Sequence, residues 1–227
     1  MTAVRDKPHF RQRFQDRFGD PDKNSSVYHE ASIKKYQGVL PDELLQHWQK
    51  DGWCSYKRGI FWLVNPEEYA SLMRDYLQGS VFQDRKDLYV VARTAFGKLF
   101  LWEKGKGNTL IINPMAGMIF LSADNDRQVL SAEDEEFEMN WFLGTKDPES
   151  LDRRDASGKG LFERALKKFG QLKSNEMYGY KLSRSLGGHE GIRNIDKVDL
   201  PIYFDIERQL KNPTVSVSDI ENNTVTY

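Results

Sequence analysis

The residues that could do chemistry in this chain are few and widely spaced. The four histidines are His9, His29, His47 and His189, and no two of them stand at the i, i+4 spacing of a helical metal pair. Cys54 is the single cysteine, so no second thiol is available for an intramolecular disulfide or a cysteine-based zinc site. We therefore predict no catalytic residues, no metal and no cofactor.

His189 lies in the most catalytic-looking segment, Gly187-Gly-His-Glu-Gly191. A hydrolase centred on His189 and Glu190 is one hypothesis. The glycines are also typical of a turn whose polar side chains are merely exposed, and we favour that interpretation. Cys54 stands beside Trp53 in a predicted strand, where a cysteine usually packs as a small apolar side chain.

Charge is balanced overall but not locally. The 227 residues include 33 of Lys and Arg against 34 of Asp and Glu, a formal net charge of −1. Segments 5–17 and 153–173 are basic, whereas 124–138 holds seven carboxylates and one arginine. Solvated helix faces explain such bias, and an acidic patch that meets a basic partner is the sharper alternative. The near-neutral total argues against a dedicated nucleic-acid binder.

Local signals predict the elements that position these residues. Phe10, Phe14 and Phe18 recur every four residues and indicate one face of a helix. Asn65-Pro-Glu-Glu68 and Ser131-Ala-Glu-Asp134 are helix starts with capping residues. Runs of β-branched and aromatic residues between 53 and 121 indicate strands in hairpin order. The pattern predicts an α+β fold, a mainly antiparallel sheet flanked by N-terminal and C-terminal helices.

The predicted core combines inward strand positions with helical stripes. Its members are Phe61, Leu63, Val90, Ala92, Leu99, Leu101, Ile111 and Ile119, packed against Leu44, Trp48, Leu72 and Met73. We predict one α+β region over residues 1–143, a C-terminal region over 144–211 packed on or near it, and a flexible polar tail over 212–227. No apolar run approaches the ~20 residues that span a bilayer, and no secretory signal precedes the first helix. These features predict a cytoplasmic protein without a membrane partner.

The first half of the chain resembles the GAD-like domain. The resemblance rests on order and spacing over residues 14–121. The matching motifs are Phe18-Gly19, Tyr36-Gln-Gly-Val-Leu-Pro41, Leu44-Leu45, Trp48, Gly52-Trp53, Tyr56, Gly59-Ile-Phe-Trp62, Val64-Asn-Pro66, Tyr69, Tyr89-Val-Val-Ala-Arg-Thr-Ala-Phe-Gly97 and Leu99-Phe-Leu-Trp102.

The second half resembles the companion domain that follows it, and the two together cover about residues 14–211. The motifs are Leu161-Phe162, Ala165, Gly170, Leu172, Asn175-Glu-Met-Tyr-Gly-Tyr180 and Leu186-Gly-Gly188. The family includes cytoplasmic immunity proteins of bacterial type VI secretion systems. The resemblance implies a partner, the cognate toxic effector, often a nuclease acting on DNA. It implies no catalytic residues.

Two functions from different classes follow. The first is an immunity protein that neutralises a toxin, with a DNase effector as the expected partner and no direct nucleic-acid binding. The alternative is a nucleic-acid- or nucleotide-associated protein that uses the basic segments 5–17 and 153–173. A toxin that grips DNA needs a positive cleft, so an inhibitor can present carboxylates to it. The predicted interface is Asp124, Asp126, Glu133, Asp134, Glu135, Glu136, Glu138 and Trp141.

Overall fold

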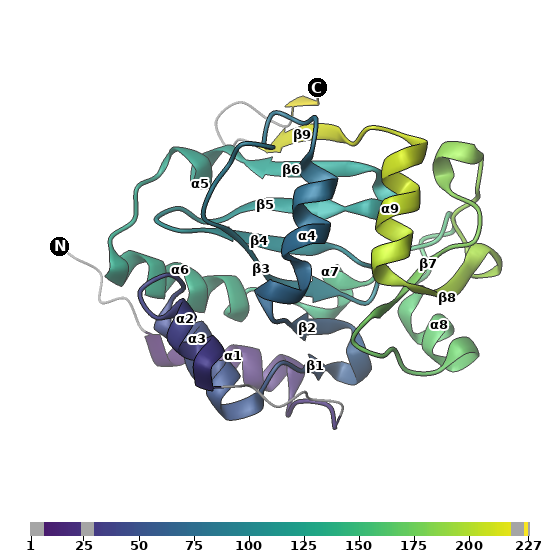
Figure 1. The fold of residues 1–227 in the computed structure, drawn as a ribbon. Helices are drawn as coiled ribbons and strands as arrows, with labels where there is room; N and C mark the ends of the chain where they lie inside the picture. The colour runs from purple at the N-terminus through teal and green to yellow at the C-terminus, as the bar shows by residue number, and fades with distance from the viewer. Residues whose placement is uncertain (1–6, 24–29, 219–224, 227) are drawn as a thin grey trace.

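A central β-sheet organises the molecule. The structure, a computed structural model, describes residues 7–23, 30–218 and 225–226 (Figure 1). The strands of the sheet, in spatial order, are β1 (Ser55–Tyr56), β2 (Phe61–Leu63), β3 (Leu88–Thr94), β4 (Leu99–Glu103), β5 (Gly107–Asn113), β6 (Met118–Ser122), β9 (Thr214–Ser218) and β10 (Val225–Thr226). All neighbours pair antiparallel except β6 and β9, which are parallel. The predicted α+β fold class is confirmed.

In the chain, the described helices lie before and between the strands. They are α1 (Lys7–Phe18), α2 (Glu30–Tyr36), α3 (Asp42–Asp51), α4 (Pro66–Leu77), α5 (Ala123–Arg127), α6 (Ala132–Gly144), α7 (Pro148–Leu151), α8 (Phe162–Phe169) and α9 (Leu200–Leu210). A separate antiparallel hairpin of β7 (Glu176–Tyr180) and β8 (Ile195–Asp199) lies beside α8 and α9 (Figure 1). Within the described residues, no helix is long and apolar enough to cross a membrane.

Helices cover both faces of the sheet. On one face α4 and α9 run side by side, and the rings of Tyr76 and Phe204 join them at 5.3 Å (Figure 1). On the other face α6 places Phe142 against Phe100 of β4, with ring centroids 5.5 Å apart. Because β4 is buried on both sides, its run Leu99–Trp102 is continuously apolar rather than alternating.

The predicted core is confirmed at ten of its twelve positions. The buried members are Phe61, Leu63, Val90, Ala92, Leu99, Leu101, Ile119, Leu44, Trp48 and Met73. Ile111 and Leu72 are only partly buried. Each of these two lines a surface hollow, Ile111 on the α6 face and Leu72 between α4 and α9. The α6 face of the sheet is therefore incompletely covered, whereas the hollow at Leu72 lies between two helices.

The predicted caps and the N-terminal helix form as expected. Asn65 accepts the amide of Glu67 at 3.1 Å, and Ser131 accepts the amide of Asp134 at 3.2 Å. Of the three spaced phenylalanines, Phe14 and Phe18 are buried against Phe61, whereas Phe10 meets Trp141 of α6 at 5.3 Å. The phenylalanine stripe thus joins α1 to both the sheet and α6.

The predicted flexible tail over 212–227 is wrong for Thr214–Ser218. These residues form β9, and the amide of Thr214 bonds to the carbonyl of Gly117 at 2.9 Å. The segment is polar because only one of its side chains, Ser216, is buried. Strand β9 lies between β6 and β10, and its backbone pairs with both, so it is held in the sheet although it buries few apolar side chains.

Two buried contacts tie the C-terminal region to the sheet. Arg93 of β3 is fully buried, lies 4.1 Å from the Trp62 ring, and donates to the carbonyl of Ser174 at 2.9 Å. Gly97 has φ +72°, and a Cβ there would lie 2.6 Å from the sulfur of Met177. Only glycine satisfies both the left-handed backbone and this close approach.

Candidate protein-interaction surface

Some carboxylates of the acidic segment 124–138 form hydrogen bonds inside the protein, and others lie at its surface. Glu136 turns inward and accepts the backbone amides of Asp42 and Glu43, the latter at 2.9 Å. Glu135 accepts the amide of Gly105 at 2.8 Å and the indole of Trp102 at 3.3 Å. These two carboxylates therefore hold α3 and the β4–β5 turn, because buried donors require acceptors.

Three further members of the acidic segment are engaged locally. Asp126 pairs with Arg85 at 2.7 Å and with Lys106 at 3.1 Å. Burial opposes its charge, but these two cations outweigh the effect and lower the pKa of Asp126. Asp124 contacts Arg127 at 2.9 Å, and Asp134 accepts the Ser131 hydroxyl at 2.7 Å. These contacts leave less of the predicted acidic surface available to a partner.

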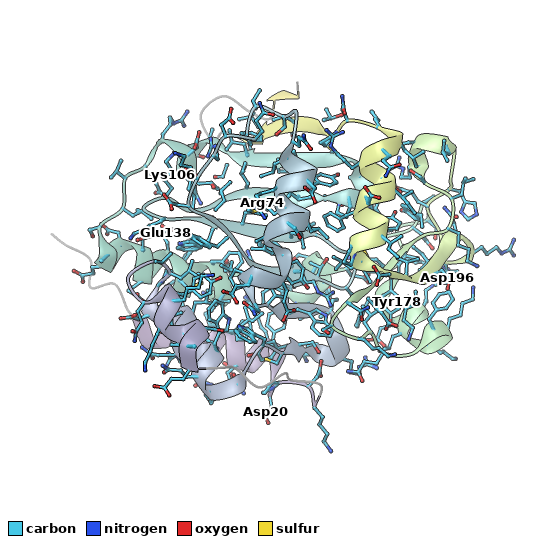
Figure 2. All side chains as sticks on the ribbon, in the orientation of Figure 1. Asp20, Arg74, Lys106, Glu138, Tyr178 and Asp196 are labelled. Carbon is cyan, nitrogen blue, oxygen red and sulfur yellow. The ribbon has the colours of Figure 1, made fainter. Side chains whose placement is uncertain are left out.

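Glu133, Glu138 and Trp141 remain at the surface of α6. Glu133 is exposed, and half of the Trp141 side chain (49%) is accessible. Glu138 and Trp141 line a hollow of about 230 Å³ between α6 and strands β5 and β6. Figure 2 places Glu138 on the side of the molecule opposite Asp196 of β8. The interface prediction is thereby narrowed to these three residues and stays a prediction.

The same hollow contains a lysine that the sequence did not single out. The amine of Lys146 lies 3.9 Å from the Phe142 ring and 4.9 Å from the Phe100 ring. No carboxylate pairs with it among the described residues. Burial, aided by the charge of Lys98, lowers the pKa of Lys146 to about 8. Phe142 precedes Lys146 by four residues, but nothing local indicates that the amine also rests on Phe100 of the distant strand β4.

The basic segments are largely committed to internal contacts. Arg11 binds Glu43 at 2.7 Å, and Arg17 donates to the carbonyl of Lys146 at 2.9 Å. In the second segment, Arg153 pairs with Glu190 at 3.1 Å and Arg164 with Asp155 at 2.5 Å. The exposed cations there are Arg154, Lys159, Lys167, Lys168 and Lys173. Arg5 of the first segment lies outside the described residues.

The His189 segment is built as a turn. Asn194 donates to the carbonyls of Leu182 and His189 at 2.9 and 3.0 Å, and so closes the loop. A Cβ on Gly188 would meet the Leu182 carbonyl at 1.9 Å, so the glycine serves the loop's closure. Glu190 is held by Arg153 and Arg184, the latter at 2.5 Å. These partners explain the glycines and Glu190 in structural terms.

The cysteine and the other three histidines are the remaining residues that could carry chemistry. Some of them are buried, and the others lie outside the described residues. Cys54 is buried, and burial raises the pKa of its thiol to about 12. His47 lies between Glu43 and Asp51, whose oxygens are 3.5 and 3.9 Å away. The His9 side chain and His29 lie outside the described residues. Across the part of the chain that is described, no group of three or more His, Cys, Asp or Glu residues could hold a metal ion.

A second surface was not predicted. Ile202, Ile206 and Leu210 of α9 are exposed, although the same helix buries Tyr203 and Phe204. In sequence, the signal is a helix with apolar residues on two faces. Core packing explains only one of those faces, so the other needs a different explanation.

Comparison with known proteins identifies both halves of the chain. The family model of the GAD-like domain matches residues 10–116. The family model of the C-terminal domain of the T6SS immunity protein Tdi1 matches residues 136–211. No curated protein matches the sequence. The crystal structure of Atu4351 from Agrobacterium tumefaciens is similar, with a TM-score of 0.81 and 27% identity, over 94% of this chain and 96% of that one. The chain therefore combines a region that matches the GAD-like domain with a following region that matches the C-terminal domain of the T6SS immunity protein Tdi1.

Proposed function

We propose that this protein is a type VI secretion immunity protein that binds its cognate toxic effector in the cytoplasm and neutralises it. The observation that carries the proposal is the Tdi1-type domain at residues 136–211, which is built into the fold rather than appended to it. Arg93 of the GAD-like domain bonds to Ser174 of this second domain, and both domains supply helices to one sheet face. The pair therefore presents one continuous surface to a partner.

We propose further that neutralisation is stoichiometric and not enzymatic. Inhibition by binding requires only a complementary surface. The local environments of Cys54 and Glu190 support this, because a thiol with a raised pKa is a poor nucleophile and the Glu190 carboxylate is already bound by two arginines.

A nuclease acting on DNA is the effector that best fits the charge of this protein. Enzymes that grip DNA carry positive clefts, because phosphate contacts supply much of their affinity. The exposed carboxylates Glu68 and Asp75 on α4 offer opposite charge to such a cleft, and Glu133 on α6 offers it on the other face of the sheet. The exposed lysines of segment 153–173 would repel it, so we place the contact away from them.

A co-expression assay tests the proposal. The effector encoded beside this protein is expressed in the bacterial cytoplasm, with and without the immunity protein, and viable counts and chromosomal DNA integrity are measured. We expect intact DNA and normal growth only in the presence of the wild-type protein. The variant His189→Ala should protect equally well. Loss of protection in a normally folded His189→Ala variant, together with activity of the pure wild-type protein on the effector, would instead indicate an enzyme.

A further inference from the structure

Exposed apolar side chains concentrate on one side of the molecule. Of the eight large apolar residues that are exposed among the described residues, three lie on α9 and two on the loop beside it. On α9, the exposed fractions are 61% for Ile202, 49% for Ile206 and 39% for Leu210, at i, i+4 and i+8. That spacing forms one stripe along the helix.

The adjoining loop extends this apolar surface. The Ser183 hydroxyl donates to Glu207 of α9 at 2.7 Å, in a buried contact. It fixes to the helix the segment that carries the exposed residues Leu182 and Leu186. Contiguous apolar surface of this kind marks interaction sites, because isolated exposed residues do not gather on one helix.

A groove runs between this stripe and α4. It encloses about 360 Å³, and its apolar lining includes Leu72 and Tyr76 from α4 with Ile202 and Phe204 from α9. Leu72 is the residue that the sequence predicts to be core and that the structure leaves partly open. Because α4 belongs to the GAD-like domain and α9 to the Tdi1-type domain, the groove exists only when both domains are present.

The groove is acidic at its edges. Glu68 and Asp75 from α4 and Asp205 from α9 line it, all three are exposed, and none makes an ion pair within the described part of the chain. The single cation in the lining, Arg208, donates to the carbonyl of Gln78 and the side chain of Asn212. Two carboxylates of α6 are not available to a partner in this way, because Glu135 and Glu136 accept hydrogen bonds from backbone amides of the protein itself.

We propose that the α4–α9 groove is the docking site for a segment of the effector that carries an apolar anchor flanked by Lys or Arg. This inference rests on the proposed immunity function and assigns it a surface. The apolar floor would receive the anchor, and the three carboxylates would meet the flanking cations. An apolar centre with a charged rim is the usual arrangement of a protein-binding hot spot.

The apolar half of the proposal is tested by single exposed substitutions. The probe is the purified effector encoded beside this protein, with its activity disabled. Ile202→Gln and Ile206→Gln should each weaken its Kd about 10- to 30-fold, since truncated hot-spot residues have effects of this size. The matched control is Val129→Gln, because Val129 is 92% exposed but lies outside the groove. It should bind as the wild type does.

The charged half is tested by the salt dependence of association. Asp75→Asn with Asp205→Asn removes two groove carboxylates and keeps their shapes. The association rate should fall about 10-fold at low ionic strength and approach the wild-type rate at high salt, where charges are screened. The control pair, Asp20→Asn with Glu149→Gln, removes two exposed carboxylates elsewhere and should leave the rate within about 2-fold.

The outcomes separate this inference from the proposed function. If the wild-type protein does not bind the effector, both are overturned. If it binds and the folded groove variants bind equally well, or if only the control pair at Asp20 and Glu149 slows association, the groove assignment is overturned and the immunity function stands. If sedimentation shows a wild-type dimer that Ile202→Gln dissociates without loss of effector binding, a second copy occupies the groove and the assignment is again overturned.

Discussion

The carboxylate of Glu136 accepts the backbone amide of Glu43 at 2.9 Å, so a side chain of α6 caps the first turn of α3. The neighbouring amide of Asp42 bonds to the same carboxylate. Helix α3 begins after Pro41, whose side chain offers no acceptor for these orphan amides. The acidic cluster that suggests a binding surface in the sequence thus contributes to the fold.

We expect Glu136→Ala to lower the free energy of unfolding by about 1–2 kcal/mol, the usual effect of removing a helix cap. Glu133→Ala, one turn earlier on the same helix, should change it by less than about 0.5 kcal/mol because Glu133 is exposed. Urea denaturation of the two variants and the wild type measures the difference. Equal stability of the two variants would contradict the capping role.

The sequence reveals the acidic cluster, but it does not show which carboxylates bond inside the protein and which stay at the surface. Glu135 and Glu136 face the turn of Gly105 and the start of α3, which lie about 30 and 90 residues away in the chain. No local pattern carries information about partners at such separations. Trp141 illustrates the same limit, because it lies in the Tdi1-type domain and its neighbour Phe10 lies at the start of the GAD-like domain.

The environment of His47 predicts a stability effect that depends on pH. Burial opposes its charge, but the carboxylates of Asp51 and Glu43 outweigh burial and raise the pKa of His47 above 6.5. The stabilisation is therefore complete below pH 6.5, and it is lost as pH rises through the pKa of the folded state. His47→Gln should cost about 1 kcal/mol at pH 6 and much less at pH 9.

Thermal or urea unfolding of His47→Gln and wild type across pH 5 to 9 checks this expectation. The pKa values of Glu43 and Asp51 are lowered, although burial opposes the charge of Glu43, so both carboxylates stay ionised at pH 5. A cost that grows as pH rises would contradict the assignment of His47 as the charged partner.

The environment of the Lys146 amine leads to a prediction about how the free energy of unfolding depends on pH. Its folded pKa of about 8 lies below the ordinary 10.5, so the folded state disfavours the charged amine. Wild-type stability should therefore rise as pH increases from about 8 towards 10.5, where only the folded state has lost the proton. Lys146→Met should raise the free energy of unfolding by about 1–2 kcal/mol at pH 7, after allowance for the lost contacts with Phe142 and Phe100.

This advantage of Lys146→Met should shrink by pH 10. The control Lys159→Met removes an exposed lysine and should change stability by less than about 0.5 kcal/mol at either pH. If the Lys146→Met advantage is absent at pH 7, or is the same at pH 7 and pH 10, the amine is not desolvated on the rings.

The contacts of Arg93 lead to a prediction about the stability of the junction between the two domains. Its guanidinium stacks on Trp62 and donates to the carbonyls of Lys173 and Ser174. Lysine has a point charge and cannot provide this planar fork, so Arg93→Lys should cost about 2–3 kcal/mol. Hydrogen exchange should show the amides near Ser174 losing protection more than those of α6. Uniform loss across the protein would contradict a local role for Arg93 between the domains.

The local elements of the fold were predictable from the sequence, whereas the pairing of β9 with β6 was not. The caps at Asn65 and Ser131 and the hairpin strands follow from short-range preferences. Strand β9 pairs parallel with β6 across about 90 residues of intervening chain, and its alternation of valine and serine misleads, because the buried side chain is Ser216. The α9 stripe is visible in sequence as surplus apolar residues, but only the structure shows that Ile202 faces a groove rather than the core.

The central claim is that this protein inhibits its effector by forming a complex and not by catalysis. The direct measurement is a titration of the purified effector's DNA-cleaving activity with the purified immunity protein, at effector concentrations well above the expected Kd. We predict that activity falls linearly, vanishes at an equimolar ratio, and does not change further with incubation time. Full activity at molar excess, or time-dependent inactivation by substoichiometric protein, would contradict this account.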